Sequence, residues 1–166
     1  QQLKSAKKYI FIVVAWFNDK EIFDLLIEIE KKKKILIKII LSEEYEGNTI
    51  NSELNFQELL EINDNVYIFK IPKDAVLVHS KYFVVDEINA ITGSYNLTYG
   101  AYLHNRETVV MFENDIENCK KLIDDLDDIY KEYCEPLIKS SISKFEDFFK
   151  KIKGNIDHGN LRMASD

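Results

Sequence analysis

The stretch VHSKYFVVDEINAITGSYN, residues 78–96, combines strand-forming residues with an unusual set of polar side chains. Its apolar segments predict two strands, and residues 87–89 predict the turn that joins them as an antiparallel hairpin. Polar side chains interrupt both strands or lie at their ends, so the stretch predicts either structural hydrogen bonds or a chemical site. These polar residues are His79, Lys81, Asp86, Ser94 and Asn96.

Before this hairpin, apolar strands alternate with amphipathic helices. Residues 9–16, 35–41 and 66–71 predict three buried strands because they are almost continuously apolar and rich in aromatic and β-branched residues. A helix that ends in four lysines separates the first two, and a short helix at residues 55–61 precedes the third. Strands that alternate with helices in this way predict parallel pairing through helical crossovers, an α/β fold.

After these elements we expect further strands at residues 75–79, 81–86, 90–93 and 107–112, with one continuous strand over the first two as the alternative, and a short helix at 98–104. Apolar residues with helical spacing predict a long helix over 115–137 and another near 141–152. The whole pattern predicts a mixed, mostly parallel sheet flanked by helices, with extra C-terminal helices. We expect one domain over residues 1–153, with a catalytic layer at about 8–112 and C-terminal helices at about 115–153, and a flexible tail or linker at 154–166.

Composition places few limits on function. The 166 residues carry a formal charge of −7, which weighs mildly against a large nonspecific nucleic-acid surface but leaves a local basic groove open. The longest apolar run, residues 9–17, is too short to cross a bilayer. Cys119 and Cys134 lie too far apart on one expected helix for a disulfide, which favours an intracellular, reducing compartment. The start at Gln1 leaves open an upstream targeting signal or a larger multidomain protein.

Several polar residues can meet at the ends of the expected strands. His79 and Lys81 are two residues apart and would share one face of a strand. Hairpin pairing would bring Ser94 and Asn96 towards them, and Glu107 begins the next strand. Lysine, serine and asparagine donate hydrogen bonds to anions, and imidazole is a nucleophile or proton carrier near neutral pH. Each residue alone has an ordinary structural explanation, but the set suits phosphoryl transfer.

Together the residues form a recognisable pattern. His79, Lys81 and Asp86 give HxKxxxxD, and residues 93–96 give GSxN, with Glu107 following downstream. The chain thereby resembles the phospholipase D superfamily over residues 9–112. The superfamily's active site contains two copies of this motif, and this chain has one. The resemblance therefore implies a phospholipase D-like fold and a homodimer with one active site at its twofold interface.

The resemblance also implies the role of each residue. His79 of one subunit would attack phosphorus to form a phosphohistidine, and the second His79 would protonate the leaving oxygen and then activate water. Lys81 and Asn96 would hold the nonbridging oxygens with help from Ser94, and Glu107 would orient His79. The mechanism needs no metal and no cofactor, because paired lysines neutralise the charge.

Asp86 is included among the candidate catalytic residues as a member of the motif, although we expect a structural role in fixing a loop or the dimer. Trp16 closes the first strand at the end where α/β sheets bind ligands, and could stack on a base or pack in the core. The lysine run at 31–34 could form a phosphate-binding rim, but a solvated helix end explains it better.

The substrate stays open between two classes. Single-motif, dimeric members of the superfamily are mostly nucleases, so the resemblance favours an endonuclease acting on DNA or RNA. A phospholipase D-type hydrolase of lipid or small phosphodiesters is the first alternative. The second is a catalytically silent nucleic-acid-binding module, which a complete set of motif residues argues against.

Overall fold

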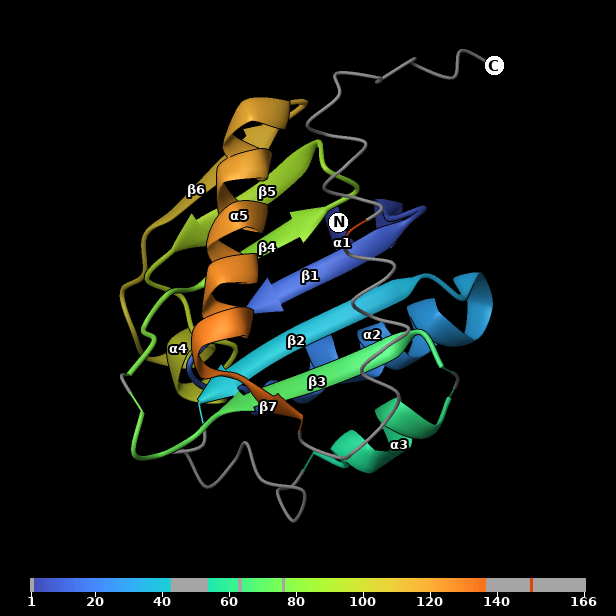
Figure 1. Cartoon of the computed structure of the whole chain (residues 1–166), viewed down its shortest axis with the longest axis horizontal. Helices are drawn as coiled ribbons and strands as arrows, with labels where there is room; N and C mark the ends of the chain where they lie inside the picture. The colour runs from blue at the N-terminus through green and yellow to red at the C-terminus, as the bar shows by residue number, and fades with distance from the viewer. Residues whose placement is uncertain (1, 43–53, 63, 76, 137–149, 151–166) are drawn as a thin grey trace.

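The computed structural model describes residues 2–42, 54–62, 64–75, 77–136 and 150. Within these residues a seven-stranded sheet carries helices on both faces (Figure 1). The elements are α1 (Gln2–Ser5), β1 (Tyr9–Val13), α2 (Lys20–Lys33), β2 (Leu36–Ser42), α3 (Phe56–Glu61), β3 (Val66–Ile71), β4 (Tyr82–Val85), β5 (Asn89–Gly93), α4 (Tyr99–Leu103), β6 (Val109–Glu113), α5 (Ile116–Tyr133) and β7 (Glu135–Pro136).

The sheet is mixed, as the sequence predicts, with the strand order β6-β5-β4-β1-β2-β3-β7. β1, β2 and β3 are parallel neighbours, and the remaining four pairings are antiparallel. Fewer strands are parallel than expected, because only two of the six described pairings are parallel. Parallel neighbours require a long crossover, and α2 and α3 lie in the crossovers that join β1 to β2 and β2 to β3, whereas a short turn joins β4 to β5.

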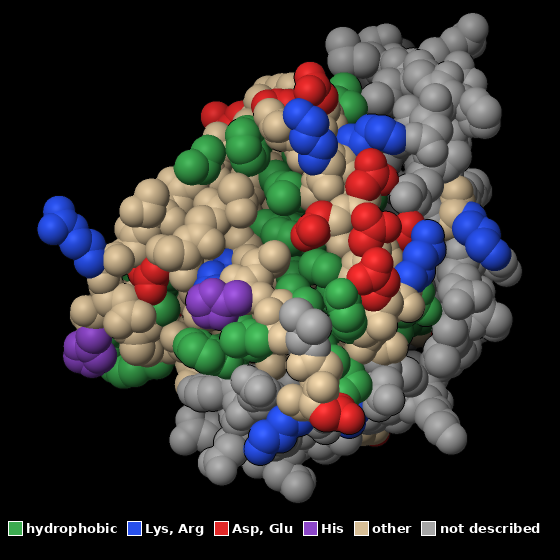
Figure 2. Space-filling view, turned by 60° about the vertical axis from the view of Figure 1, so that its left-hand side comes forward, with side chains coloured by type: hydrophobic (Ala, Val, Ile, Leu, Met, Phe, Trp, Pro, Cys, Tyr) green, Lys and Arg blue, Asp and Glu red, His purple; other side chains and the backbone are tan. Residues whose placement is uncertain are grey.

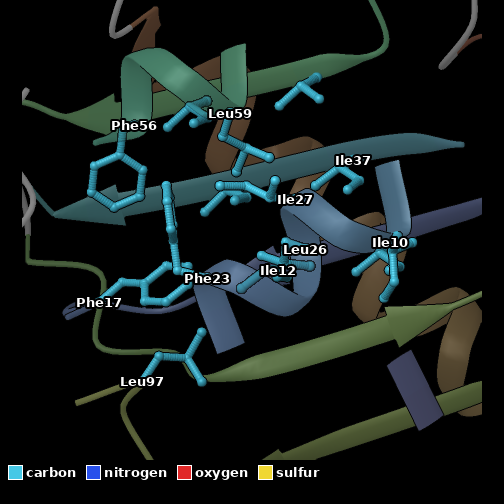
Figure 3. Close-up of a cluster of buried hydrophobic side chains, with 14 of the residues drawn as sticks. Ile10, Ile12, Phe17, Phe23, Leu26, Ile27, Ile37, Phe56, Leu59 and Leu97 are labelled. Atoms are coloured by element: carbon cyan, nitrogen blue, oxygen red, sulfur yellow. The ribbon is translucent and has the colours of Figure 1, made fainter. Parts of the chain in front are cut away.

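Two apolar layers enclose the sheet. On one face, side chains of β1 and β2 pack against α2 and α3, and Figure 3 shows Phe17, Phe23 and Phe56 meeting in this layer. The three rings contact one another edge to face, with centroids 5.4 to 6.2 Å apart. On the other face, α5 covers the sheet through residues such as Ile123 and Leu126. Burial on both faces explains why every residue of β1 and β2 is buried.

The helix ends follow the sequence signals. Asp19 accepts a hydrogen bond from the backbone N–H of Ile22 at 3.0 Å and begins α2. The helix ends at Lys34, which adopts a left-handed conformation with φ of 52° after three lysines in the last turn. Lysines there suit the negative end of the helix dipole, so the lysine run is accounted for by the helix end.

The strand expected at residues 75–79 was wrong: Ala75 donates its N–H to the carbonyl of Pro72 in a turn, and residues 77–81 lie outside the ladder. Pairing of β4 with β1 starts only at Tyr82, opposite Val13. The helix expected near 141–152 and the tail at 154–166 lie outside the described residues, apart from Lys150, which is helical. Both cysteines, Cys119 and Cys134, are free, as expected.

Candidate active site

The candidate catalytic residues meet at one end of the sheet. His79 and Lys81 lie just before β4, Ser94 and Asn96 follow β5, and Glu107 precedes β6. These three strands are neighbours and antiparallel, so the start of β4, the end of β5 and the start of β6 lie side by side. The hairpin thus assembles the two parts of the motif, as the sequence predicts.

Lys81 is the buried charge of this site. Its side chain is 5% exposed, and its Nζ donates a hydrogen bond to the carbonyl oxygen of His79 at 2.6 Å. Burial lowers the pKa of the Lys81 amine, and the nearby Glu107 carboxylate acts in the opposite direction. The carbonyl of Lys81 accepts hydrogen bonds from the Gly93 N–H and the Thr92 hydroxyl, which fix its backbone to β5.

Glu107 connects the ends of two strands. It accepts a hydrogen bond from the Ser94 hydroxyl and another from the Asn105 amide at 3.0 Å. The backbone N–H of Thr108 donates to the Ser94 Oγ at 3.0 Å. The bond from Ser94, the bond from Asn105 and the positive charge of Lys81 lower the pKa of the Glu107 carboxyl. Glu107 is thus the anionic partner of Lys81 and Ser94.

The expected orientation of His79 by Glu107 is not found. Within the described residues, the hydrogen bonds of Glu107 run to Ser94 and Asn105, and the neighbour of the His79 ring is Trp16. The imidazole and indole rings meet edge to face, with centroids 5.9 Å apart and planes at 70°. The His79 side chain is exposed and Trp16 is half-buried. The imidazole is therefore accessible to a substrate.

Asn96 provides a buried amide beside these groups. It is 8% exposed, and its Oδ1 accepts a hydrogen bond from the backbone N–H of Trp16 at 3.4 Å. With the oxygen bound in this way, the amide directs its NH₂ donors away from Trp16. A fixed amide donor and a buried ammonium are the groups that stabilise negative charge on a phosphoryl oxygen.

Asp86 lies apart from the other candidate site residues, at the opposite end of β4. It follows the last residue of β4, whereas Lys81 precedes the first, which separates them by about 16 Å at the rise of a strand. Its carboxylate accepts the backbone N–H groups of Lys7, Lys8 and Tyr9 at 2.7, 2.8 and 3.0 Å. The structural role expected for this residue agrees with these bonds, because they fix the start of β1 to the β4–β5 turn.

Charge is unevenly distributed around the site. Figure 2 shows both described histidines at the surface on the left of the view with one acidic side chain between them, while a group of acidic side chains lies to the right of centre and others lie along the upper edge. Among the described residues, no His, Cys, Asp and Glu side chains form a group of three that could hold a metal ion.

The comparisons with known proteins agree with this geometry. The family model described as "Cardiolipin synthase, PLD-like domain" matches residues 1–132. The chain belongs to the phospholipase D superfamily. The match covers the whole sheet except β7 and includes every candidate site residue.

Relatives within the superfamily are distant in sequence. Phospholipase D of Rickettsia typhi is 27% identical over 114 residues, which cover 69% of this chain and 52% of that protein. Phospholipase D of Rickettsia prowazekii is 25% identical over 114 residues, with the same coverage of both chains. The chain thus spans about half the length of these two relatives.

Solved structures share the fold. Nuc from Salmonella typhimurium, a phospholipase D family member, superposes with a TM-score of 0.66 at 22% identity, covering 81% of this chain and 85% of that one. NucT from Helicobacter pylori gives a TM-score of 0.65 at 20% identity, covering 81% and 86%. No helix in the described part of this superfamily member is long and apolar enough to span a membrane.

Sequence reasoning missed two features of the site. Asn105 binds Glu107, and its position two residues before the glutamate was the only signal available. The contact of Trp16 with both His79 and Asn96 joins residues more than 60 positions apart, and no spacing rule predicts it. Only the pairing of β4 next to β1 reveals it.

Proposed function

We propose that this chain is a metal-independent phosphodiesterase that cleaves nucleic acid through a covalent phosphohistidine. The observation that carries the proposal is the exposed His79 imidazole beside a buried ammonium and a buried amide, those of Lys81 and Asn96. A nucleophile next to fixed anion donors suits attack on a phosphodiester, because the donors stabilise the charge that develops on the nonbridging oxygens.

The proposed reaction has two steps. A ring nitrogen of His79 forms a bond to phosphorus as the bond to the leaving oxygen breaks, and a second imidazole gives that oxygen its proton. The second imidazole then takes a proton from water, whose oxygen attacks phosphorus and releases His79. Two identical imidazoles in different protonation states titrate as one coupled pair.

The second imidazole is proposed to come from a second copy of the chain. The other described histidine, His104, follows α4 and is not part of an HxK motif. Exposed apolar side chains are available near the site for a twofold interface: Leu77 is 45% exposed and Leu103 is 47% exposed. Burial of such residues in a dimer would bring two His79 side chains together at one axis.

Nucleic acid is the proposed substrate for two reasons. A chain with one motif resembles the dimeric nucleases of the superfamily more than its longer, two-motif phospholipases. In addition, α4 follows the GSxN segment directly and carries two tyrosines, Tyr99 and Tyr102, that are each 64% exposed. Exposed aromatic rings beside a phosphodiester site are suitable platforms for nucleotide bases.

A lipid phosphodiester is the second candidate, favoured by the names of the Rickettsia relatives and of the matching family model. The experiment incubates the full chain with single- and double-stranded DNA, RNA, and phosphatidylcholine vesicles, each with EDTA. We expect cleavage of DNA or RNA that His79→Ala abolishes and His104→Ala preserves. Cleavage of the vesicles alone would select the lipid substrate, and a strict need for Mg²⁺ would refute the mechanism.

Quenching a reaction with ³²P-labelled substrate in denaturant tests the intermediate. We expect label on the wild-type protein and on His104→Ala, and none on His79→Ala. Sedimentation equilibrium tests the shared site, since a strictly monomeric protein that still cleaves would refute it.

A further inference from the structure

Trp16 touches both parts of the motif at once. Its backbone N–H donates to the Asn96 Oδ1 at 3.4 Å, and its indole lies edge to face with the His79 imidazole at 5.9 Å between centroids. HxK and GSxN are separated by the whole β4–β5 hairpin, and Trp16 comes from neither of its strands. A single residue from the segment that follows β1 therefore contacts the proposed nucleophile and a proposed anion donor.

The backbone around Trp16 is fixed from two sides. Towards β2, Val14 donates to the carbonyl of Ile40 and the carbonyl of Ala15 accepts from Ser42, each at 3.1 Å. Trp16 is the next residue, so its Cα is held at a defined distance from the sheet.

The other side of the segment is tied to the residue after Asn96. The carbonyl of Leu97 accepts the N–H groups of Asn18 and Asp19 at 2.7 and 2.9 Å, and Phe17 forms a parallel bridge with Leu97. Phe17 is fully buried beneath this bridge. The backbone position of Trp16 is thus determined by main-chain bonds and by packing of Phe17, neither of which depends on substrate.

We propose that Trp16 is a positioning residue that holds the His79 imidazole in the orientation required for attack on phosphorus, an inference that rests on the proposed function. His79 is exposed and lies outside the ladder, so rotation of its side chain has to be limited by a neighbour. The Glu107 carboxylate is bonded to Ser94 and Asn105, and the indole is the ring in contact with the imidazole. A misplacement of about 1 Å can reduce a rate by 100-fold. A fixed neighbour that limits rotation of the His79 ring therefore affects the rate of the chemical step.

A different role for Trp16, stacking on a nucleotide base, makes opposite kinetic predictions. A base platform contributes to substrate binding, so its loss raises KM for substrates with bases and leaves base-free diesters unaffected. A positioning residue contributes to the chemical step, so its loss lowers kcat for every phosphodiester to the same extent. Half-burial and an edge contact with His79 favour the second role, because part of the indole surface is already occupied.

The kinetic test compares Trp16→Leu with Trp16→Phe on an oligonucleotide and on bis(p-nitrophenyl) phosphate. Leucine keeps apolar bulk without a ring, and phenylalanine keeps a ring, so both should fold, which thermal unfolding checks. We expect Trp16→Leu to lower kcat by about 10- to 100-fold on both substrates with KM within twofold, and Trp16→Phe to recover most of the rate. A raised KM on the oligonucleotide alone, or no effect on kcat, would overturn the proposal.

A spectroscopic test separates this inference from the proposed function. In NMR spectra of protein labelled with ¹³C-histidine, the ring current of the indole should displace the His79 ring signals in wild type and Trp16→Phe, but much less in Trp16→Leu. His104 provides the exposed reference, and Tyr102→Ala, which removes an exposed aromatic ring of α4 and leaves the Trp16–His79 ring contact intact, is the matched control variant. His79 signals unchanged in Trp16→Leu would refute positioning even if the protein is a nuclease. Absence of any cleavage by wild type would refute the proposed function alone.

Discussion

The proposed mechanism requires Lys81 to remain charged, although this residue is only 5% exposed. Burial lowers the pKa of its amine, and the Glu107 carboxylate opposes that effect. An amine that loses its proton no longer stabilises a phosphoryl oxygen. The alkaline limit of activity should therefore lie below the ordinary lysine pKa of 10.5, at a pH that Glu107 helps to determine.

Replacing Glu107 with glutamine tests this coupling. The substitution removes a negative charge that favours the protonated amine, so the pKa of Lys81 falls further and the alkaline limb of the kcat/KM profile moves to lower pH. The profile of Glu113→Gln, a change at the far end of β6, should overlay that of wild type. An alkaline limb that stays in place or moves upward in Glu107→Gln would show that Lys81 does not set it.

Asp86 is expected to contribute to stability and not to catalysis. Asp86→Ala leaves three backbone N–H groups at the start of β1 without their acceptor, which should lower the free energy of unfolding by about 1–3 kcal/mol. Urea unfolding measures the loss, and kcat per folded molecule should be unchanged. Asp86→Asn keeps one acceptor oxygen and tolerates φ of 54°, so it should lose less. A large loss of kcat in an Asp86→Ala protein of unchanged stability would show that Asp86 contributes to catalysis.

The sequence was sufficient to predict where the residues of the motif lie in the fold. Strand alternation and hairpin pairing bring Lys81, Ser94 and Asn96 to one end of the sheet, as expected. It was insufficient where a contact depends on side-chain rotamers or on distant strands. The expected partner of His79 was Glu107, yet the ring contact is to Trp16, because β4 pairs with β1.

At the scale of elements, Gly93 explains how closely β5 and β6 can approach at the site. A Cβ atom at this position would lie 2.1 Å from the carbonyl oxygen of Thr108 and 2.9 Å from the Cα of Val109. Both are backbone atoms and cannot rotate away. Thr108 is also the residue whose N–H binds the Ser94 hydroxyl, so the glycine permits the contact that unites Ser94 with Glu107.

Gly93→Ala should therefore damage both stability and activity. The methyl group forces β5 and β6 apart, which we expect to cost about 1–3 kcal/mol, and separates Ser94 from Glu107. Thermal unfolding and kcat/KM measure the two effects. Gly100→Ala is the matched control, since a Cβ there meets nothing within 4 Å, and a helical alanine should be neutral or stabilising. Equal behaviour of the two variants would contradict this role of Gly93.

Elements with a strong local pattern were predictable, and those decided by pairing partners were not. The alternation of helices with buried strands predicts the parallel β1–β2–β3 unit. The segment at 75–79 has strand-forming residues, but Pro72 begins a turn and β1 ends at Val13, opposite Tyr82, so the described residues of this segment have no partner strand. A strand needs a neighbour, and the local sequence does not specify one.

At the scale of the molecule, Lys38 is an ionisable group placed in the middle of the layer between the sheet and α5. It is fully buried, and its Nζ lies 3.9 Å from the ring centroid of Tyr130 and 5.0 Å from that of Phe69. Burial lowers the pKa of its amine to about 7, while Cys134 and Asp127 act in the opposite direction. Aromatic faces attract a cation, but the net balance disfavours the charge.

Lys38→Met should stabilise the protein below pH 7 by about 1–4 kcal/mol, because methionine fills the layer without a buried charge. The unfolded chain keeps the lysine proton up to a pKa of 10.5, and the folded chain releases it near 7. Between these values the unfolded state binds more protons, so wild type gains stability as pH rises and the advantage of the variant shrinks.

Urea unfolding of Lys38→Met and wild type at a series of pH values measures this difference. Lys20→Met, on the exposed surface of α2, should show no such trend. A Lys38→Met protein that is less stable at every pH would mean that the Tyr130 and Phe69 rings outweigh burial and that Lys38 stabilises this layer as a cation.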